Sequence, residues 1–382
     1  MNTAVLPGGF SQDKFLTEYW QQKPLLIRQA FPHIQPPCSA EELAGLCCGT
    51  ETPARLVIEQ ERNRWQLLQS PFEERHFLEL PDTHWTLLVN DFEQYYPKLL
   101  EEIISHFRFI PDWRIDDLMI SYAPEGGSVG PHIDEYDVFL IQVSGERQWM
   151  LDPDADASNI LPDCELSILA EFNAQQDWTL RAGDLLYLPP RLAHYGIAQA
   201  TTDPHGCMTY SVGFRSPNQQ ELLNAWLNHL WERNQGTQRY SDKKRQPQKH
   251  TGEISKEDLQ GLKQVVLESI EQPEQLASWL GSYLTHAKNE AQDIEQLTDH
   301  LPKDTACFRH PDTRIAWVQQ ADHLQLFING MVSRWPLATK AGVEYLCSHY
   351  HYTDQELKGL LEQADFHNLY HYLCSNNFLQ LL

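Results

Sequence analysis

The fold class of this chain is decided by two stretches, Gly127-Ser-Val-Gly-Pro-His132-Ile-Asp134 and Gly183-Asp-Leu-Leu-Tyr-Leu-Pro-Pro-Arg-Leu-Ala-His194. The first holds a His-x-Asp pair, and the second holds a histidine just past a Gly-Asp turn and a Pro-Pro turn. Two imidazoles and one carboxylate are the ligand set of the facial triad of non-haem Fe(II) oxygenases, which leaves one face of the metal open. His132, Asp134 and His194 are therefore candidate metal ligands and candidate catalytic residues.

The period of an extended chain predicts that His132 and Asp134 point the same way, because side chains two apart in a β-strand share a face. The apolar run 138–143 predicts a buried strand, and His194 is expected to open a neighbouring strand that returns it to the metal. The alternative is a chance His-x-Asp pair among 17 histidines and 53 acidic residues, with His194 as a buried core residue.

Taken together, the two motifs resemble those of cupin-type barrels, in particular the JmjC-related 2-oxoglutarate oxygenases. Residues 15–31 resemble the entry segment of the ribosomal oxygenase branch, and segments 114–121 and 132–149 resemble the bacterial ribosomal protein arginine hydroxylases. The resemblance covers most of the chain and is strongest over residues 10–215. It implies an α+β fold whose core is a double-stranded β-helix, the cupin or jelly-roll barrel, with flanking helices.

Length and composition limit the classes of function that this chain can have. With 382 residues the chain exceeds one typical domain. The net charge of 29 − 53 = −24 disfavours binding to nucleic acid and favours a basic partner, although solubility alone also explains it. Eight cysteines without a C-x-x-C pair predict reduced thiols. We find no signal peptide pattern and no apolar run of membrane-spanning length, so we expect a cytoplasmic protein.

Changes in sequence texture predict three parts: a JmjC/cupin catalytic domain over 1–216, a helical dimerisation region over 217–300 and a winged-helix-like domain over 301–382. The homodimer is expected from a helix over 218–233, whose alternative role is packing against the barrel of its own chain. Its apolar stripe consists of Leu222, Leu223, Trp226, Leu230 and Trp231. The last part has no Arg/Lys-rich recognition helix, so we expect a structural or docking role without direct DNA binding.

Periodicity and turn residues also predict individual elements. The expected helices cover 15–22 (after a Ser11 cap), 39–46, 91–107, 255–270, 275–287, 337–347, 353–363 (with Thr353-x-x-Glu356 as a capping box) and 367–375. The expected strands cover 24–28, 54–59, 65–68, 117–122, 208–214, a hairpin of 315–318 and 324–328, and 378–382.

A 2-oxoglutarate oxygenase needs a cation for the distal carboxylate of its co-substrate. Arg147 follows the Gly145 turn, and the ribosomal oxygenase family has a basic residue at the matching position. A guanidinium can hold a carboxylate through paired hydrogen bonds. The alternative is a surface arginine paired with Glu146 or Asp152. The hydroxyl of Ser121 is a second candidate for co-substrate binding.

The substrate side of the site is predicted from strand parity. Tyr136 shares a face with Asp134 if the strand continues, Asp117 shares a face with Ser121, and Ser211 lies on a strand over 208–214. An acid, a phenol and a hydroxyl can hold a guanidinium. Asp117 as a turn cap and Tyr136 as an ordinary core residue remain the alternatives.

The resemblance implies an Fe(II)-, 2-oxoglutarate- and O2-dependent hydroxylase acting on an arginine of a basic large-subunit ribosomal protein. Histidine hydroxylation, lysine demethylation and a non-catalytic cupin scaffold are the alternatives. The chain contains no P-loop, dinucleotide fingerprint or Gly-x-Ser-x-Gly in a suitable strand-helix context.

Overall fold

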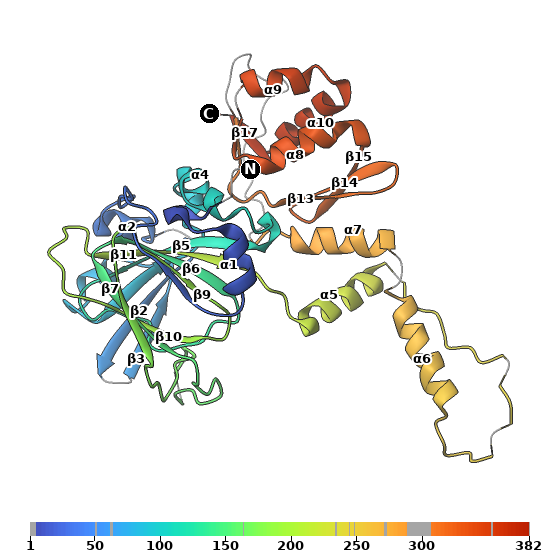
Figure 1. Cartoon of the computed structure of the whole chain (residues 1–382), viewed down its shortest axis with the longest axis horizontal. Helices are drawn as coiled ribbons and strands as arrows, with labels where there is room; N and C mark the ends of the chain where they lie inside the picture. Colours follow the sequence, from blue (N-terminus) through green and yellow to red (C-terminus); the bar gives the residue numbers. More distant parts are fainter. Residues whose placement is uncertain are drawn as a thin grey trace. The chain divides into compact units, whose positions relative to one another are not determined.

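The computed structural model of the chain describes residues 5–49, 52–61, 64–162, 164–233, 235–243, 245–247, 249–270, 273–288, 307–352 and 354–381. The chain divides into two compact units, Met1–Ser216 and Pro217–Leu382, each with its own hydrophobic core (Figure 1). Among these residues no helix is long and apolar enough to cross a membrane. The eight cysteines are free thiols.

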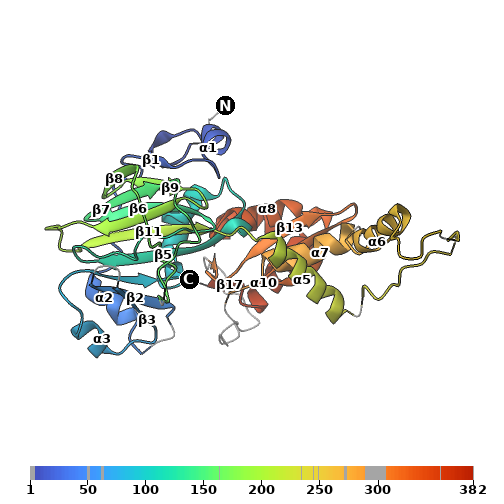
Figure 2. The same ribbon diagram turned by 90° about the horizontal axis from the view of Figure 1, so that it is seen from below.

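The first unit contains two antiparallel β-sheets (Figures 1 and 2). In the described part of the chain, the larger sheet has eight strands in the order β1-β9-β6-β11-β5-β4-β2-β3, and the smaller has three in the order β10-β7-β8. The strands are β1 (Leu25–Ile27), β2 (Ala54–Glu61), β3 (Arg64–Gln69), β4 (Trp85–Val89), β5 (Ile115–Ala123), β6 (Asp137–Ser144), β7 (Glu146–Asp152), β8 (Gln176–Arg181), β9 (Leu185–Leu188), β10 (Ala193–Ala198) and β11 (Cys207–Phe214).

Alternate side chains of the two sheets meet and form the core between them. The larger sheet contributes Val138, Leu140, Leu186 and Leu188, and the smaller contributes Trp149, Leu151 and Leu180, all buried. Because Arg147 alternates in step with Trp149 and Leu151 along β7, it faces the same interior. Two face-packed sheets with flanking helices confirm the predicted α+β class.

Short helices cover the outer face of the larger sheet. Phe15 of α1 packs edge-on against Tyr187 at 4.8 Å between ring centroids, and Phe107 lies 4.5 Å from Phe139. The helices of this unit are η1 (Pro7–Gly9), α1 (Gln12–Glu18), α2 (Ala40–Leu46), α3 (Glu74–Leu78), η2 (Phe92–Gln94), α4 (Lys98–Glu102), η3 (Ile104–Phe107) and η4 (Asp112–Arg114). Ser11 caps α1 as predicted, and Ser39 with Glu42 forms a capping box on α2.

The single helix predicted over 91–107 is wrong, because η2, α4 and η3 replace it. Pro97 lies between η2 and α4, and a proline inside a helix removes a hydrogen bond and clashes with the preceding turn. Asp91, at φ 49°, starts this segment in the left-handed region.

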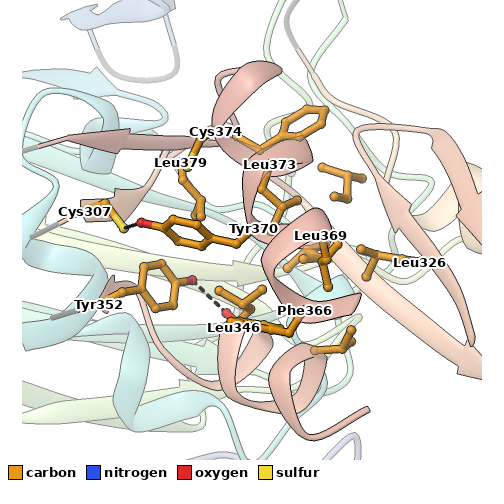
Figure 3. Packing of buried hydrophobic residues seen from close by; sticks show 14 of the residues in the cluster. Cys307, Leu326, Leu346, Tyr352, Phe366, Leu369, Tyr370, Leu373, Cys374 and Leu379 are labelled. Carbon is orange, nitrogen blue, oxygen red and sulfur yellow. Dashed lines mark hydrogen bonds between the residues drawn. The ribbon is translucent and has the colours of Figure 1, made fainter. Parts of the chain in front are cut away.

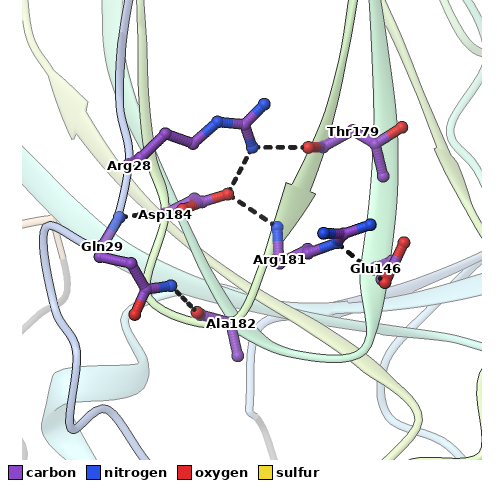
Figure 4. Close-up of polar contacts among 7 residues, drawn as sticks. All are labelled: Arg28, Gln29, Glu146, Thr179, Arg181, Ala182 and Asp184. Carbon is purple, nitrogen blue, oxygen red and sulfur yellow. Dashed lines mark hydrogen bonds and ion pairs between the residues drawn. The ribbon is translucent and has the colours of Figure 1, made fainter.

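Polar contacts fasten β1 to the turn between β8 and β9 (Figure 4). The Arg28 guanidinium donates to Asp184 at 2.6 Å and to the Thr179 carbonyl at 2.7 Å. The buried Asp184 carboxylate also accepts from the backbone N–H groups of Gln29 and Arg181. This network holds the edge of the larger sheet beside the turn with which the second motif begins.

The second unit ends in a small α+β domain. Its strands are β12 (Cys307–Arg309), β13 (Ile315–Gln319), β14 (His323–Ile328), β15 (Met331–Pro336), β16 (His351–Tyr352) and β17 (Leu379–Leu381), and its helices are η5 (Leu337–Thr339), α8 (Lys340–Ser348), α9 (Asp354–Leu361) and α10 (Ala364–Ser375). The predicted hairpin is β13–β14, and β15 adds a third strand. The predicted capping box at Thr353 lies outside the described residues.

The core of this domain is formed by side chains of α8, α10 and the strands (Figure 3). Inside it the Tyr370 hydroxyl lies 3.1 Å from the Cys307 thiol, and the Tyr352 hydroxyl donates to the Leu346 carbonyl at 2.7 Å. Each buried phenol therefore has a polar partner, as buried tyrosines require.

Three helices precede this domain: α5 (Gln219–Glu232), α6 (Lys256–Glu268) and α7 (Pro273–Leu284). Trp226 and Leu230 of the predicted stripe pack against Trp279 of α7 and are buried. Trp231, in contrast, is 85% exposed. The stripe is therefore divided between a contact within the chain and an exposed face.

Candidate metal centre

The three predicted metal ligands lie together. The Nε2 atoms of His132 and His194 are 3.8 Å and 3.6 Å from Oδ2 of Asp134, and the ligand atoms of all three residues lie within 4.8 Å of one another. Within the described part of the chain, these three residues are the one group of His, Cys, Asp or Glu side chains whose ligand atoms lie close enough to hold a metal ion. Separations of this size allow one cation to contact all three atoms after small side-chain adjustments.

Backbone carbonyls orient both imidazoles. Nδ1 of His132 lies 2.9 Å from the Gly130 carbonyl oxygen, and Nδ1 of His194 lies 2.9 Å from the Leu192 carbonyl oxygen. Because a carbonyl only accepts, each Nδ1 carries the proton and donates it, which leaves the Nε2 lone pair for a metal.

Burial also keeps the His194 ring in the neutral form that can bind a metal. Burial and, to a smaller extent, the neighbouring His132 lower the pKa of His194 to about 4, against the opposing effect of the Asp134 charge. The imidazole is therefore neutral near pH 7, as ligation requires. Trp149 packs 5.8 Å from this ring, and its own indole fills the space beside Gly196, where a Cβ atom would lie 2.7 Å from it.

The backbone brings His132 to His194 in a way that strand parity did not predict. Residues 132–136 are not a strand, and β6 begins only at Asp137. Instead, His132 and His194 exchange two backbone hydrogen bonds of 3.0 Å, and Gly127 pairs with Ala198 in the same antiparallel sense. Segment 126–132 therefore runs along β10 as an irregular edge of the smaller sheet.

Arg147 is buried on the interior face of β7, only 3% exposed. Its Nε and Nη2 atoms have no hydrogen-bond partner within the described residues, and its guanidinium lies 5.8 Å from the Trp149 ring. The alternative pairings are excluded, because Glu146 pairs with Arg181 and Asp152 accepts from the backbone at 154 and 173. A buried cation without a partner is costly, so the guanidinium fits an anionic ligand such as a carboxylate.

Ser121 lies on the interior face of β5, in register with Thr209 of β11. It is 4% exposed, and its hydroxyl is 3.4 Å from the Thr209 carbonyl oxygen. The buried hydroxyl of Ser144 has no hydrogen-bond partner among the described residues. The interior of the barrel thus contains polar groups next to its apolar core.

Asp117 and Tyr136, predicted to bind substrate, come close to each other around Gly213. A Cβ atom at Gly213 would lie 3.5 Å from Oδ1 of Asp117 and 4.0 Å from Cε2 of Tyr136. Burial raises the pKa of the Tyr136 phenol, as do the nearby Asp134 and Asp117 charges. Ser211 lies two residues before Gly213 on β11, where it pairs with Met119 of β5 and with Leu140 of β6.

Several residues around the site were not predicted. Asn90 donates to Asp117 at 3.0 Å, and Arg55 of β2 reaches Sδ of Met119 at 4.0 Å. Glu93 accepts from the Leu118 N–H at 3.0 Å. These contacts depend on the pairing of β4 with β2 and β5, and no local sequence signal marks them.

Comparison with known proteins finds two matching families and several relatives. Residues 102–222 match the JmjC domain family, and residues 268–380 match the ROXA-like winged helix family. The chain is 37% identical over 276 residues to the ribosomal protein uL16 3-hydroxylase of Escherichia coli (strain K12), which covers 72% of each protein. It is 33% identical over 341 residues to a probable ribosomal oxygenase of Haemophilus influenzae, covering 85% of this chain and 82% of the relative.

Solved structures agree over almost the whole chain. An X-ray structure of E. coli YcfD superposes with a TM-score of 0.83 at 30% identity, covering 97% of this chain and 98% of that one. YcfD, a ribosomal oxygenase, has also been solved in complex with cobalt and 2-oxoglutarate, with a TM-score of 0.80, 30% identity and 97% coverage of both chains.

Proposed function

Because this chain belongs to the JmjC ribosomal oxygenase family, we propose that it is an Fe(II)- and 2-oxoglutarate-dependent hydroxylase acting on an arginine of the large-subunit ribosomal protein uL16. The observation that carries this proposal is the cluster of His132, Asp134 and His194, whose possible ligand atoms lie within 4.8 Å of one another. These residues would hold the iron. With 2-oxoglutarate and O2, bound iron supplies the oxidising chemistry that hydroxylates an unactivated C–H bond.

The protein's own side chains would do the positioning. Arg147 would bind the far carboxylate of 2-oxoglutarate through its unpartnered Nε and Nη2 atoms. The buried hydroxyl of Ser121 would assist from β5. The buried core of Trp149, Leu140 and their neighbours lies beside Arg147 on this interior and would keep water away from the bound co-substrate.

On the substrate side, Asp117 would pair with the guanidinium, while Tyr136 and Ser211 would orient the stem and head of the side chain. Asp117 is 8% exposed, so a cation placed beside it would be largely desolvated and strongly attracted. Holding both ends of the side chain presents one methylene to the metal, and position alone selects that carbon. The net charge of −24 favours the approach of a basic ribosomal protein.

The experiment is a comparison of peptides. A peptide of uL16 carrying the target arginine, and its Arg→Lys and Arg→His versions, are incubated with Fe(II), 2-oxoglutarate and O2, and the products are sequenced by mass spectrometry. We expect hydroxylation of the arginine peptide alone, and lower turnover with the Asp117→Asn enzyme. Equal hydroxylation of the histidine peptide would favour histidyl hydroxylase activity, and loss of a methyl group from a methyl-lysine peptide would favour a demethylase.

We also propose the following arrangement of parts: a catalytic domain over 1–216, a helical dimerisation region over 217–300 and a winged-helix-like domain over 301–382. A homodimer is supported by the exposed apolar side chains of α5 and α6. These are Leu223, Leu227, Trp231, Leu259, Leu262 and Val266. Helix α7 contacts both α5 and the winged-helix-like domain, because Trp279 packs on Trp226 of α5 and Gly281 packs on Phe327 of β14.

A further inference from the structure

The turn after β4 makes direct contact with the carboxylate of Asp117. The side-chain amide of Asn90 donates to Oδ2 of Asp117 at 3.0 Å, and the backbone N–H of Asp91 approaches the same oxygen at 3.4 Å. Asp91 adopts φ 49°, a left-handed conformation that directs its N–H at the carboxylate only while this turn keeps its shape. Two donors on one oxygen fix the rotation of the carboxylate about its Cβ–Cγ bond.

The same turn holds the strand that carries Asp117. Glu93, 7% exposed, accepts a hydrogen bond of 3.0 Å from the Leu118 N–H with its Oε2 atom. Burial, together with the nearby Asp117 charge, raises the pKa of Glu93 to about 8. Near neutral pH Glu93 is therefore protonated and does not compete with Asp117 for a cation.

The second oxygen of Asp117 lies on the side of Gly213 and Tyr136. Oδ1 would be 3.5 Å from a Cβ atom at Gly213, and the Tyr136 ring would be 4.0 Å from the same position. The Tyr136 phenol in turn lies near Asp134, one of the three predicted metal ligands, whose charge raises its pKa. Asn90 thus sets the orientation of the Asp117 carboxylate. That orientation determines whether Oδ1 faces a side chain placed between Asp117 and the metal centre.

We propose that Asn90 is a positioning residue for substrate recognition: it orients the Asp117 carboxylate toward the cationic side chain of the substrate, and Glu93 anchors the strand beneath it. This inference rests on the proposed function, because it assigns Asn90 a role in arginine binding. This role gives Asn90 no direct contact with the metal, 2-oxoglutarate or the reacting carbon. Its effect is on the affinity for the substrate, transmitted through Asp117.

The test is a double-mutant cycle with Asn90→Ala, Asp117→Asn and the double variant, measured with the arginine peptide. We expect Asn90→Ala to raise the peptide KM about tenfold, the loss of one hydrogen bond to a charged group. The kcat and the KM for 2-oxoglutarate should stay within about twofold of wild type. In the Asp117→Asn background, Asn90→Ala should change the peptide KM by less than about twofold. Gln66→Ala, which removes an exposed hydrogen bond that the Gln60 side chain donates to the Gln66 side chain on the same sheet, is the matched control and should leave the peptide KM unchanged.

Two results would overturn the inference. One is an unchanged peptide KM in Asn90→Ala, and the other is an equal effect of Asn90→Ala with and without the Asp117 carboxylate. If Asn90→Ala fails to fold, the isosteric Asn90→Asp replaces it: a carboxylate facing Oδ2 of Asp117 should raise the peptide KM at least as much, and an unchanged KM rejects the role. A wild-type enzyme that does not hydroxylate the arginine peptide would instead reject the proposed function itself.

Discussion

Replacement of Arg147 by methionine should separate co-substrate binding from metal binding. The side chain is 3% exposed, and its Nε and Nη2 atoms have no partner in the described part of the protein. Loss of one charge-assisted hydrogen bond costs about 1.5–3 kcal/mol, which corresponds to a Kd increase of roughly 10- to 150-fold. We therefore expect weaker binding of 2-oxoglutarate by at least this factor and unchanged binding of the metal.

Two measurements check this expectation. Calorimetric titration of 2-oxoglutarate into the cobalt-loaded protein gives the Kd directly, and thermal unfolding without ligands gives the stability. Because the Nε and Nη2 atoms of this buried cation have no hydrogen-bond partner among the described residues, Arg147→Met should be at least as stable as wild type in the absence of 2-oxoglutarate. Added 2-oxoglutarate should raise the melting temperature of wild type and not that of the variant.

The control is Arg181→Met on the neighbouring strand β8. The Arg181 side chain is 71% exposed and pairs with Glu146, so its loss should leave the Kd for 2-oxoglutarate unchanged. An Arg147→Met protein that binds 2-oxoglutarate as tightly as wild type would refute the assignment of this guanidinium to the co-substrate.

Three further predictions follow from the geometry. His132→Ala or Asp134→Ala should abolish succinate formation with an unchanged circular dichroism spectrum; retained activity in either variant would contradict the ligand assignment. The pKa of Glu93 is about 8 in the folded protein and roughly 4.3 in an unfolded chain, so the folded state binds the extra proton between these values and stability falls as pH rises through this window. Glu93→Gln should remove this loss, making the variant more stable relative to wild type at pH 8 than at pH 5 in urea unfolding, and a difference that does not depend on pH would refute the buried, protonated carboxyl. Trp231→Glu should shift the full-length protein from dimer to monomer in light scattering, because this side chain is 85% exposed on α5, and a variant that stays dimeric would place the interface elsewhere.

Sequence reasoning could find residues that are marked by local chemistry or by a family motif. His132, Asp134 and His194 lie in Gly-flanked motifs, so ligand preference and spacing select them, whereas Arg147, after the turn at Gly145, is selected by the resemblance to the ribosomal oxygenase family. Their side chains converge because the smaller sheet pairs His194 with Leu151 and Ala198 with Arg147, a register that no single segment specifies.

The errors have physical causes. The predicted helix over 91–107 ignored Pro97, which breaks the hydrogen-bonded run. The strand parity assumed for 132–136 failed because this segment is irregular before β6, although Tyr136 still lies within the influence of the Asp134 charge.

Contacts between distant residues could not be predicted at all. Asn90 and Glu93 contact residues 27 and 25 positions away, and only the pairing of β4 with β5 brings them together. Amide and carboxyl side chains in a turn carry no signal of such a role in the sequence. The support of Asp117 therefore became visible only in three dimensions.

The most direct test of the central claim is mass spectrometry of uL16 after incubation with the purified enzyme, Fe(II), 2-oxoglutarate and O2. His132→Ala serves as the inactive control. We expect the mass gain of a single oxygen atom on one arginine, formed together with an equal amount of succinate and absent when 2-oxoglutarate is omitted. An unmodified uL16 in the presence of active, metal-loaded enzyme, or an oxygen atom located on a histidine or lysine, would contradict the assignment.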